Sequence, residues 1–184
     1  MWRAPPDPPE RGSPPVSVHA ADYDRRIHFD KPLPRLTLPD RDVELVRSIL
    51  RVDAPMRHGQ FVWDERAAPT GPLWVRVDLS RQMISVFRNR HEIGTAVILF
   101  GTDAGPTPPG VYPILAKMRD HRSSLYDAEM PFTLRLTGDG IAIHASAVRR
   151  GSATHGCIGV PAPFARRLFE AARVGDRVVI QARA

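Results

Sequence analysis

The sequence predicts a mainly β protein, with a β-sandwich or barrel-like fold and one or two short helices. From residue 73 onward, apolar and polar side chains alternate with a period of two, the pattern of a half-buried strand. Further short apolar segments follow at close spacing, and one convincing helical segment comes only near the end of the chain. A series of strands with a single late helix favours a layered or closed β fold.

Residues 1–70 are predicted to form a proline-rich N-terminal extension with a short helix. Nine of the 19 prolines lie within the first 39 residues, where no apolar periodicity develops, so we expect this start to be loose. Residues 39–51 follow with acidic residues in their first turn and an apolar face, the pattern of an amphipathic helix with a structural role. The apolar face would consist of Val43, Val46, Ile49 and Leu50.

Residues 71–184 are predicted to form the folded domain, which a segment rich in proline and glycine at 66–72 separates from the extension. The first strand covers residues 73–80, and "MISVFR" and "EIGTAVILF" then form a hairpin that turns near "NRH". Further strands are expected at 110–116, 132–136, 140–146 and 176–182. The late helix covers 161–173, with prolines at its start and Gly175 as its stop.

Composition and charge limit the classes of protein to consider. The chain is 42% hydrophobic and 25% charged, as in ordinary globular proteins. No segment has the length and apolarity of a membrane span, and the start lacks the basic-then-apolar pattern of a secretory signal. The net charge of +6 favours anionic surroundings, but no nucleic-acid-binding motif is present, so we expect no nucleic-acid partner. Nothing in the sequence indicates an oligomeric state.

The single cysteine, Cys157, lies in the segment "GSATHGCIGVP" and is either a buried apolar side chain or a nucleophile. A thiol attacks carbonyl groups well only as a thiolate, which a neighbouring histidine can generate. Two histidines qualify by position: His144 ends an apolar strand 13 residues earlier, and His155 lies two residues before the cysteine. Spacing in sequence gives no distance, so both interpretations stay open on the residues alone.

The same segment suggests two further kinds of chemistry, an oxyanion hole and a zinc site. Gly156 allows a tight turn that exposes backbone N–H groups, so Gly156 and Cys157 could form an oxyanion hole. His144, His155 and Cys157 could also be zinc ligands, but the H-x-C spacing is unusual for zinc and no second motif accompanies it. We therefore expect no metal site.

Three segments, in the same order along the chain, resemble the L,D-transpeptidase catalytic domain family (YkuD-like). "IHASAVRRGSATHGCIGV" is similar to the family signature of a histidine, a loop and Ser/Thr-His-Gly-Cys, here His144 and Thr154 to Cys157. "GTDAGPTPPGVYPIL" resembles the family's Thr-Pro-x-Gly turn, and "MPFTLRLTGDGIAIH" resembles its Met-Pro-aromatic approach to the histidine strand. The resemblance covers residues 72–182 and implies a β-rich sandwich.

The resemblance implies cysteine-dependent acyl transfer on peptidoglycan stem peptides, without a metal or an organic cofactor. Cys157 would be the nucleophile and His144 the base, while Gly156, His155 and Thr154 would support the oxyanion hole and its loop. The acyl group would pass to an amine of a second stem, and the protein would work in the periplasm or cell envelope. Transfer to water, as in an L,D-carboxypeptidase, and a non-catalytic peptidoglycan-binding domain are the alternatives.

The chain departs from the family pattern at two positions near the proposed nucleophile. Gly159 stands where the family usually has arginine or asparagine, and Ala145 stands where it usually has glycine or serine. We expect the first change to remove a polar contact and the second to alter how the histidine is oriented.

A long polar connection is predicted to cover the site. Residues 117–131, "KMRDHRSSLYDAEMP", join two expected strands with polar and basic residues instead of a short turn. Long loops in compact domains are commonly functional, so we expect a flap over the site. The candidates for substrate contacts on this flap are Arg119, Arg122 and Tyr126.

Overall fold

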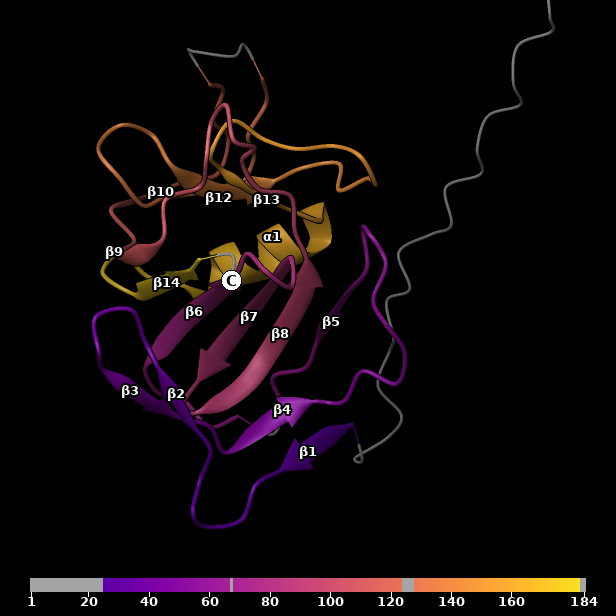
Figure 1. Cartoon of the computed structure of the whole chain (residues 1–184), viewed down its shortest axis with the longest axis vertical. Coiled ribbons are helices and arrows are strands. Elements are labelled where there is room, and N and C mark those ends of the chain that lie inside the picture. Colours follow the sequence, from indigo (N-terminus) through magenta and orange to yellow (C-terminus); the bar gives the residue numbers. More distant parts are fainter. Residues whose placement is uncertain (1–24, 67, 124–127, 183–184) are drawn as a thin grey trace, which may run out of the picture.

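The computed structural model of the protein describes residues 25–66, 68–123 and 128–182 (Figure 1). Within these ranges lie fourteen strands and one helix. Eight strands form a large sheet, four form a smaller sheet, and two form a separate hairpin. Helix α1 (Ala162–Ala171) lies between the two larger sheets in Figure 1 and contacts strands of both. The predicted mainly β fold is confirmed.

The large sheet is built around an antiparallel meander. Strands β6 (Leu73–Asp78), β7 (Met83–Arg88) and β8 (His91–Val97) pair in sequence order, so the predicted hairpin is confirmed. Strand β14 (Arg177–Gln181) returns beside β6 in parallel, and β9 (Gly110–Pro113) pairs with β14 in antiparallel orientation. The order across the sheet is β1-β4-β8-β7-β6-β14-β9, with β5 also paired to β8.

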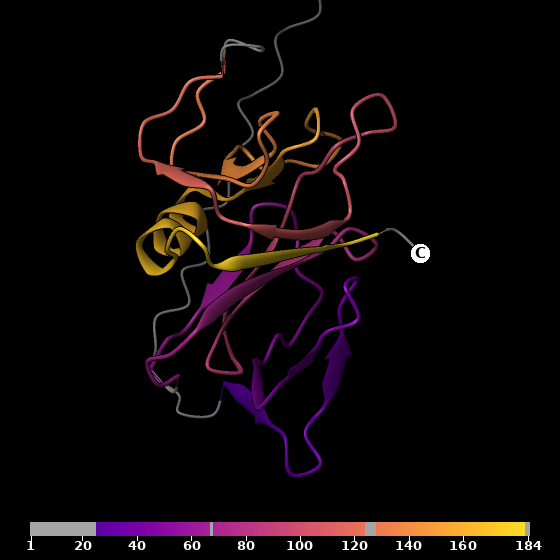
Figure 2. The same ribbon diagram turned by 90° about the vertical axis from the view of Figure 1, so that its left-hand side faces the viewer.

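The N-terminal region contributes strands where a helix and a loose segment were expected. Its elements are β1 (Arg26–His28), β2 (Arg35–Thr37), β3 (Val43–Leu45), β4 (Ser48–Leu50) and β5 (Phe61–Trp63). Strands β1, β4 and β5 belong to the large sheet, while β2 and β3 pair with each other. Figure 2 shows these indigo and violet segments at the end of the molecule opposite the smaller sheet. Residues 1–24 lie outside the described ranges.

The helix predicted for residues 39–51 is wrong, because pairing with neighbouring strands determines the conformation of this segment. Strand β3 pairs with β2, and β4 pairs with both β1 and β8, which supplies backbone hydrogen-bond partners that an isolated helix would have to provide internally. The apolar side chains also do not share one face: Val46 is buried, whereas Val43 is 39% exposed. Tertiary pairing overrides the helical pattern here.

The smaller sheet positions the histidine and cysteine segments. It has the order β10 (Ala116–Met118), β11 (Thr133–Arg135), β12 (Ala142–Ala145) and β13 (Ile158–Val160). The first three strands are antiparallel, but β12 and β13 run in parallel. The predicted strand at 110–116 is divided between β9 and β10, and β13 was not predicted because only three residues form it.

One hydrophobic core joins the sheets through helix α1. The buried face of the helix consists of Phe164, Ala165, Leu168 and Phe169. The ring of Phe164 packs edge-on against Phe61 and Trp63 of β5, and Phe169 packs against Phe132 next to β11. The helix therefore holds the smaller sheet on the large one. In the described part of the chain, no helix has the length and apolarity that crossing a membrane requires.

Candidate active site

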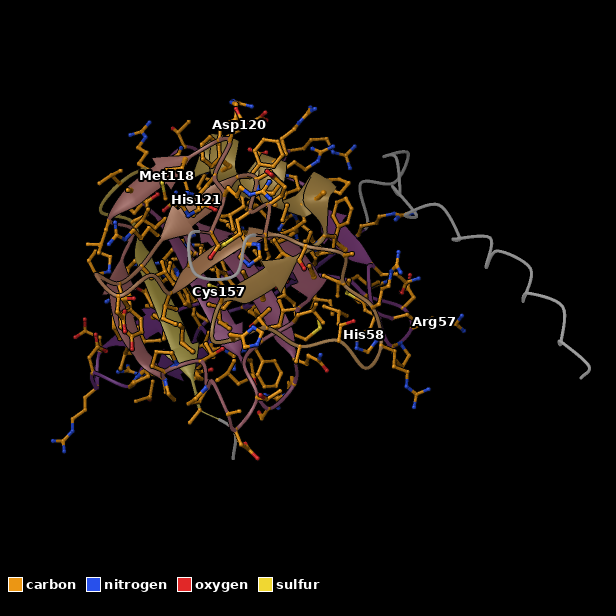
Figure 3. All side chains as sticks on the ribbon, turned by 90° about the horizontal axis from the view of Figure 1, so that it is seen from above. Arg57, His58, Met118, Asp120, His121 and Cys157 are labelled. Carbon is orange, nitrogen blue, oxygen red and sulfur yellow. The ribbon has the colours of Figure 1, made fainter. Side chains whose placement is uncertain are left out.

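The parallel pair β12 and β13 brings His144 and Cys157 into one pocket. His144 lies in β12 opposite Gly159 of β13, and Cys157 directly precedes β13. Both side chains line a pocket of about 160 Å³, together with Met130 and Thr154. The 12 residues between them, 145–156, include the loop that folds back and brings the two side chains into this pocket. Seen from the side of the smaller sheet, Cys157 lies centrally, whereas Arg57 and His58 lie at the periphery (Figure 3).

A backbone carbonyl fixes the tautomer of His144. The Nδ1 atom lies 2.8 Å from the carbonyl oxygen of Ala145, which can only accept, so Nδ1 carries a proton and donates it. The neutral ring then has its lone pair on Nε2. Burial lowers the pKa of His144, and the charge of His121 lowers it further, while the hydrogen bond to Ala145 opposes both. His144 is thus a neutral imidazole at neutral pH, ready to accept a proton.

The thiol of Cys157 is half-buried and protonated at rest. Burial raises its pKa, and a hydrogen bond from the backbone of Ala142 opposes this only in part. The Sγ atom donates a long, weak hydrogen bond of 3.7 Å to the carbonyl oxygen of Gly140. With both groups neutral, the pair is suited to proton transfer during attack and not to a preformed thiolate–imidazolium ion pair.

Gly156 is required by its backbone conformation and by space. Its φ angle is +115°, in a region that other residues rarely adopt, and a Cβ there would lie 2.8 Å from Cδ1 of Ile141. Its carbonyl oxygen accepts a hydrogen bond of 2.8 Å from Oγ1 of Thr107. On the other side of the nucleophile, Oγ1 of Thr154 donates to the carbonyl oxygen of Cys157 at 2.5 Å. The peptide groups on both sides of Cys157 are thereby held by threonine hydroxyls.

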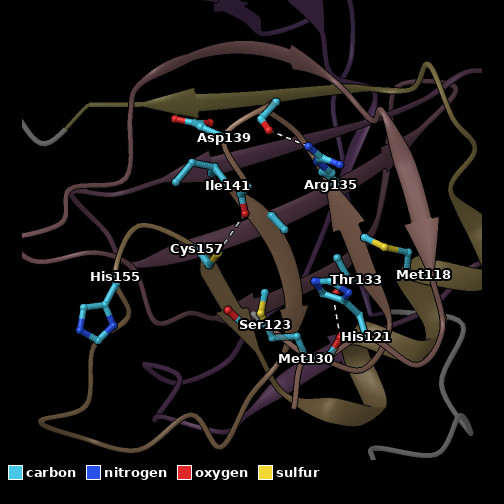
Figure 4. A pocket seen from close by; sticks show the side chains of 13 residues that line it. Met118, His121, Ser123, Met130, Thr133, Arg135, Asp139, Ile141, His155 and Cys157 are labelled. Carbon is cyan, nitrogen blue, oxygen red and sulfur yellow. Dashed lines mark hydrogen bonds between the residues drawn. The ribbon is translucent and has the colours of Figure 1, made fainter. Parts of the chain in front are cut away.

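A larger hollow of about 340 Å³ adjoins the nucleophile (Figure 4). Its polar side chains include His121, Ser123, Arg135 and Asp139, and its floor includes the β11–β12 turn. Arg135 donates hydrogen bonds to the carbonyl oxygens of Thr137 and Gly138, which stiffens this turn. The two pockets share Ser123, Met130, His155 and Cys157, so they form one site with two compartments on either side of the thiol.

The structure brings together some of the predicted site residues and not others. Cys157, His144, Thr154 and the exposed His155 all line the smaller pocket. Arg119 does not line either compartment: its guanidinium lies over the rings of Phe132 and Phe169, 5.7 and 5.5 Å from their centres.

The other two candidates on the flap have different outcomes. Arg122 forms an exposed ion pair with Glu129, at 2.6 Å between Nη1 and Oε1, and lines neither compartment. Tyr126 lies outside the described residues. The flap residues that do line the site are Met118, His121, Ser123, Ala128 and Met130.

Sequence reasoning missed the flap lining residues and Thr107. No sequence signal separates His121 or Ser123 from other polar residues of a loop, whereas Met130 begins the quoted Met-Pro-aromatic segment. Thr107 is the threonine of the quoted Thr-Pro-x-Gly segment, so the sequence could single out this residue. It could not indicate the contact of Thr107 with Gly156.

The two departures from the family pattern have structural explanations. A Cβ at Gly159 would lie 2.9 Å from Cβ of Ser146 and 3.3 Å from Cβ of Leu99, so this position has no room for a side chain. Ala145 holds His144 through its backbone carbonyl, which any residue would supply, and its side chain is buried in the core. The expected change in histidine orientation therefore does not follow from the side chain at 145.

The described residues do not contain a cluster of three or more His, Cys, Asp or Glu side chains arranged to hold a metal ion. His144, His155 and Cys157 all line the smaller pocket but do not form such a cluster. The site in this part of the chain is one of a thiol, an imidazole and backbone groups.

Known proteins resemble this chain in both sequence and fold. Residues 72–180 match the model of the L,D-transpeptidase catalytic domain family (YkuD). No curated protein sequence matches the chain. A solved L,D-transpeptidase from Stackebrandtia nassauensis has a similar fold, with a TM-score of 0.57 and 23% identity over 62% of this chain and 58% of the other.

Two mycobacterial structures have the same similarity. The L,D-transpeptidase from Mycobacterium smegmatis has a TM-score of 0.56 and 20% identity, over 60% of this chain and 58% of that one. L,D-transpeptidase 3 from Mycobacterium tuberculosis, solved in complex with a faropenem-derived adduct, has a TM-score of 0.54 and 22% identity, over 60% of each chain. At these identities the likeness shows the fold, and this chain spans less than two thirds of each of the three structures.

Proposed function

Because the chain belongs to the L,D-transpeptidase catalytic domain family, we propose that it transfers acyl groups on peptidoglycan stem peptides with Cys157 as the nucleophile. The observation that carries this proposal is that His144 and Cys157, 13 residues apart, line one pocket beside a loop held by glycine and threonine residues. Family membership alone would not require an intact thiol and base. We place the activity in the cell envelope, where the substrate is.

The proposed reaction begins with proton transfer inside the smaller compartment. Nε2 of His144 takes the thiol proton while Sγ forms a bond to the carbonyl carbon between the third and fourth stem residues. The carbonyl π electrons move to oxygen, and the resulting oxyanion is stabilised by backbone N–H groups at Gly156 and Cys157. Collapse breaks the carbon–nitrogen bond, and the imidazolium returns its proton to the departing amine. An amine of a second stem then attacks the thioester and gives a proton to His144; the carbon–sulfur bond breaks, and His144 returns the proton to the departing sulfur, which restores the thiol.

The test is covalent labelling of the thiol by a carbapenem, a β-lactam whose strained carbonyl accepts the same attack. The faropenem-derived adduct in the Mycobacterium tuberculosis structure supports this choice of reagent. Intact-protein mass spectrometry is expected to show one adduct of the mass of the drug on the wild-type chain and none on Cys157→Ala. In His144→Ala the adduct should form on the order of 100-fold more slowly, because the general base is lost.

His28→Ala is the matched control, since His28 is an exposed histidine on β1 at the opposite end of the molecule. This variant should be labelled at the wild-type rate. If folded wild-type protein, whose thiol still reacts with iodoacetamide, gives no adduct after long incubation, acyl transfer is refuted. A peptidoglycan-binding domain without turnover would then be the better interpretation. Both reactions release the terminal residue of a stem tetrapeptide, so chromatography has to separate the other product: a cross-linked dimer shows transfer to an amine, and a free tripeptide shows transfer to water.

A further inference from the structure

A single buried hydroxyl connects the loop before β9 to the backbone of the nucleophile segment. Thr107 is 4% exposed, and its Oγ1 lies 2.9 Å from the backbone nitrogen of Gly101 and 2.8 Å from the carbonyl oxygen of Gly156. The nitrogen of Gly101 can only donate and the carbonyl of Gly156 can only accept. The hydroxyl proton is therefore committed to Gly156, and its direction is fixed.

The two loops are packed too closely for this contact to shift freely. A Cβ on Gly101 would lie 2.9 Å from both Cα and the backbone nitrogen of Gly156, and one on Gly105 would lie 3.2 Å from Cα of His155. A Cβ on Gly156 would lie 3.3 Å from the carbonyl oxygen of Pro106. The peptide groups of residues 101–107 thus support the backbone just before the nucleophile, and the Thr107 hydroxyl is the polar tie between them.

The direction of the Gly156 carbonyl fixes the direction of the next N–H group. A peptide bond is planar and trans, so the C=O of Gly156 and the N–H of Cys157 point in opposite directions. The carbonyl points at Thr107, which is buried and lines neither compartment of the site. The N–H of Cys157 therefore points away from Thr107, within the same peptide plane and on the opposite side of the C–N bond. A carbonyl oxygen attacked by Sγ would have to lie next to this group.

We propose that Thr107 is a positioning residue that aims the backbone N–H of Cys157 at the developing oxyanion. This inference rests on the proposed function, because it concerns the step in which the carbonyl π electrons move to oxygen as the sulfur–carbon bond forms. Thr107 does not touch the reacting atoms. Without its hydroxyl, the Gly156 carbonyl loses its partner and the peptide plane can rotate, which turns the donor away from the oxyanion.

The experiment compares two reactions of the same thiol, only one of which forms an oxyanion. Carbapenem acylation passes through a tetrahedral intermediate, whereas alkylation by iodoacetamide displaces iodide at a saturated carbon. Thr107→Val keeps the shape of the side chain and removes the hydroxyl. We expect it to slow acylation by about 10- to 100-fold, less than the loss of a whole oxyanion donor. Alkylation should stay within about twofold, because the thiol's exposure and pKa are unchanged.

Two further variants test whether the hydroxyl itself is responsible. Thr107→Ser restores the hydroxyl and should recover most of the acylation rate. Thr95→Val is the matched control, because it removes another buried threonine hydroxyl, which donates to the carbonyl oxygen of Ile84 in the large sheet. It should leave both reactions at wild-type rates. If Thr107→Val does not fold, as judged by circular dichroism, Thr107→Ala removes the hydroxyl without a second methyl group and carries the same expectations.

Three outcomes decide between the explanations. A selective loss of acylation in Thr107→Val that Thr107→Ser reverses supports the positioning role. An equal loss of acylation and alkylation means that the site as a whole is distorted, and unchanged acylation means that the hydroxyl is irrelevant; either result overturns the inference. Failure of the wild-type chain to be acylated refutes the proposed function instead, and is seen before any Thr107 variant is measured.

Discussion

The absence of a side chain at position 159 is a packing requirement of strand β13, which directly follows the nucleophile. Gly159 exchanges two backbone hydrogen bonds with Leu99, of 2.8 and 2.9 Å, and an added Cβ would lie within 3.3 Å of side-chain carbons of Leu99 and Ser146. We therefore expect Gly159→Ala to lower the free energy of unfolding by about 1–3 kcal/mol through overpacking. Denaturation in urea, followed by circular dichroism, measures this change.

Gly138→Ala is the matched control, since nothing lies within 4 Å of the added Cβ at that position. The free energy of unfolding of this variant should differ from that of the wild type by less than about 0.5 kcal/mol, as is usual for a surface substitution. Removing Cβ of Ser146 should make the alanine at 159 less costly, so Gly159→Ala is expected to cost less in a Ser146→Gly background. If Gly159→Ala lowers the free energy of unfolding equally in both backgrounds, contact with the Ser146 side chain is not the cause of the destabilisation.

Single residues differ in how far the sequence alone could predict them. His144 and Cys157 could be proposed as neighbours because their chemical types and the order of the surrounding motifs point to one site. The contact of Thr107 with Gly156 spans 49 positions in the chain, and no local pattern encodes it. Arg119 illustrates the opposite error: a cation on a polar loop suggested substrate binding, but its guanidinium stacks on the rings of Phe132 and Phe169.

At the scale of elements, the connection between β10 and β11 is a short antiparallel ladder over the site. Backbone hydrogen bonds join Phe132 to Arg119, Met130 to His121, and Ser123 to Ala128. The side chains of Ser123 and Met130 line both compartments beside Cys157. This arrangement supports the flap that the sequence predicted, although two of its three predicted contact residues do not line the described site and the third is outside the described ranges.

Shortening the flap should affect the two thiol reactions in opposite directions. Replacing residues 122–129 by Gly-Gly removes Ser123 and Ala128 from the wall of the site. Carbapenem acylation is then expected to fall by about tenfold, since the substrate is less well positioned, while iodoacetamide alkylation should become faster because the thiol is more exposed. Stopped-flow or timed mass spectrometry measures both rates.

The exposed ion pair of the flap offers the control for this shortening. Arg122→Gln breaks its contact with Glu129, but both side chains are more than half exposed, so the pair contributes little to stability. Acylation in this variant should match the wild-type rate. If shortening the flap leaves acylation unchanged, the flap has no part in the reaction.

Element predictions succeeded for the longer strands and failed for most of the strands of three residues. Strands β6, β7 and β8 follow one another in sequence and in the sheet, so their alternation alone predicts them. Residues 39–51 have apolar spacing that also fits a helix, and only pairing of β4 with β1 and β8 selects strands. In the same way, β13 is three residues long and is defined by its parallel neighbour β12.

At the scale of the whole molecule, the N-terminal strands complete the large sheet: β1 and β4 lie at the end opposite the smaller sheet, and β5 lies alongside β8 (Figure 1). One edge of β8 pairs with β7. The other edge pairs with β4 at His91 and with β5 at residues 94–96. Phe61 and Trp63 of β5 also pack on Phe164 of helix α1. The segment that matches the family model starts only at residue 72, so strands outside that match support its sheet and its core.

Arg26 is the polar centre of this attachment. The residue is only 6% exposed. Its guanidinium donates to Ser48 Oγ at 3.1 Å and to the carbonyl oxygens of Glu92 and Asp64 at 2.6 and 2.5 Å. One side chain thus joins β1, β4, β8 and the residue after β5. The buried carboxylate of Glu92 accepts from the backbone nitrogen of Leu50 at 2.8 Å. Burial raises the pKa of Glu92, and Arg26 is one of the groups that oppose this rise.

We therefore expect residues 67–184 alone to fail to fold. In the full chain, Arg26→Ala should lower the free energy of unfolding by about 3 kcal/mol at neutral pH, because the buried carbonyl oxygens of Glu92 and Asp64 lose their donor and the charge of Arg26 no longer opposes the raised pKa of Glu92. Without Arg26 the pKa of Glu92 in the folded protein rises further above its unfolded value. A buried acid with a raised pKa destabilises the fold as pH rises, so the loss should be larger at pH 8 than at pH 5, where the carboxyl is more often protonated. Ile27→Ala is the control on the same strand, since Ile27 is 40% exposed, and its small cost should not depend on pH. A truncated chain with a cooperative thermal transition near that of the full chain would show that the first strands are dispensable for folding.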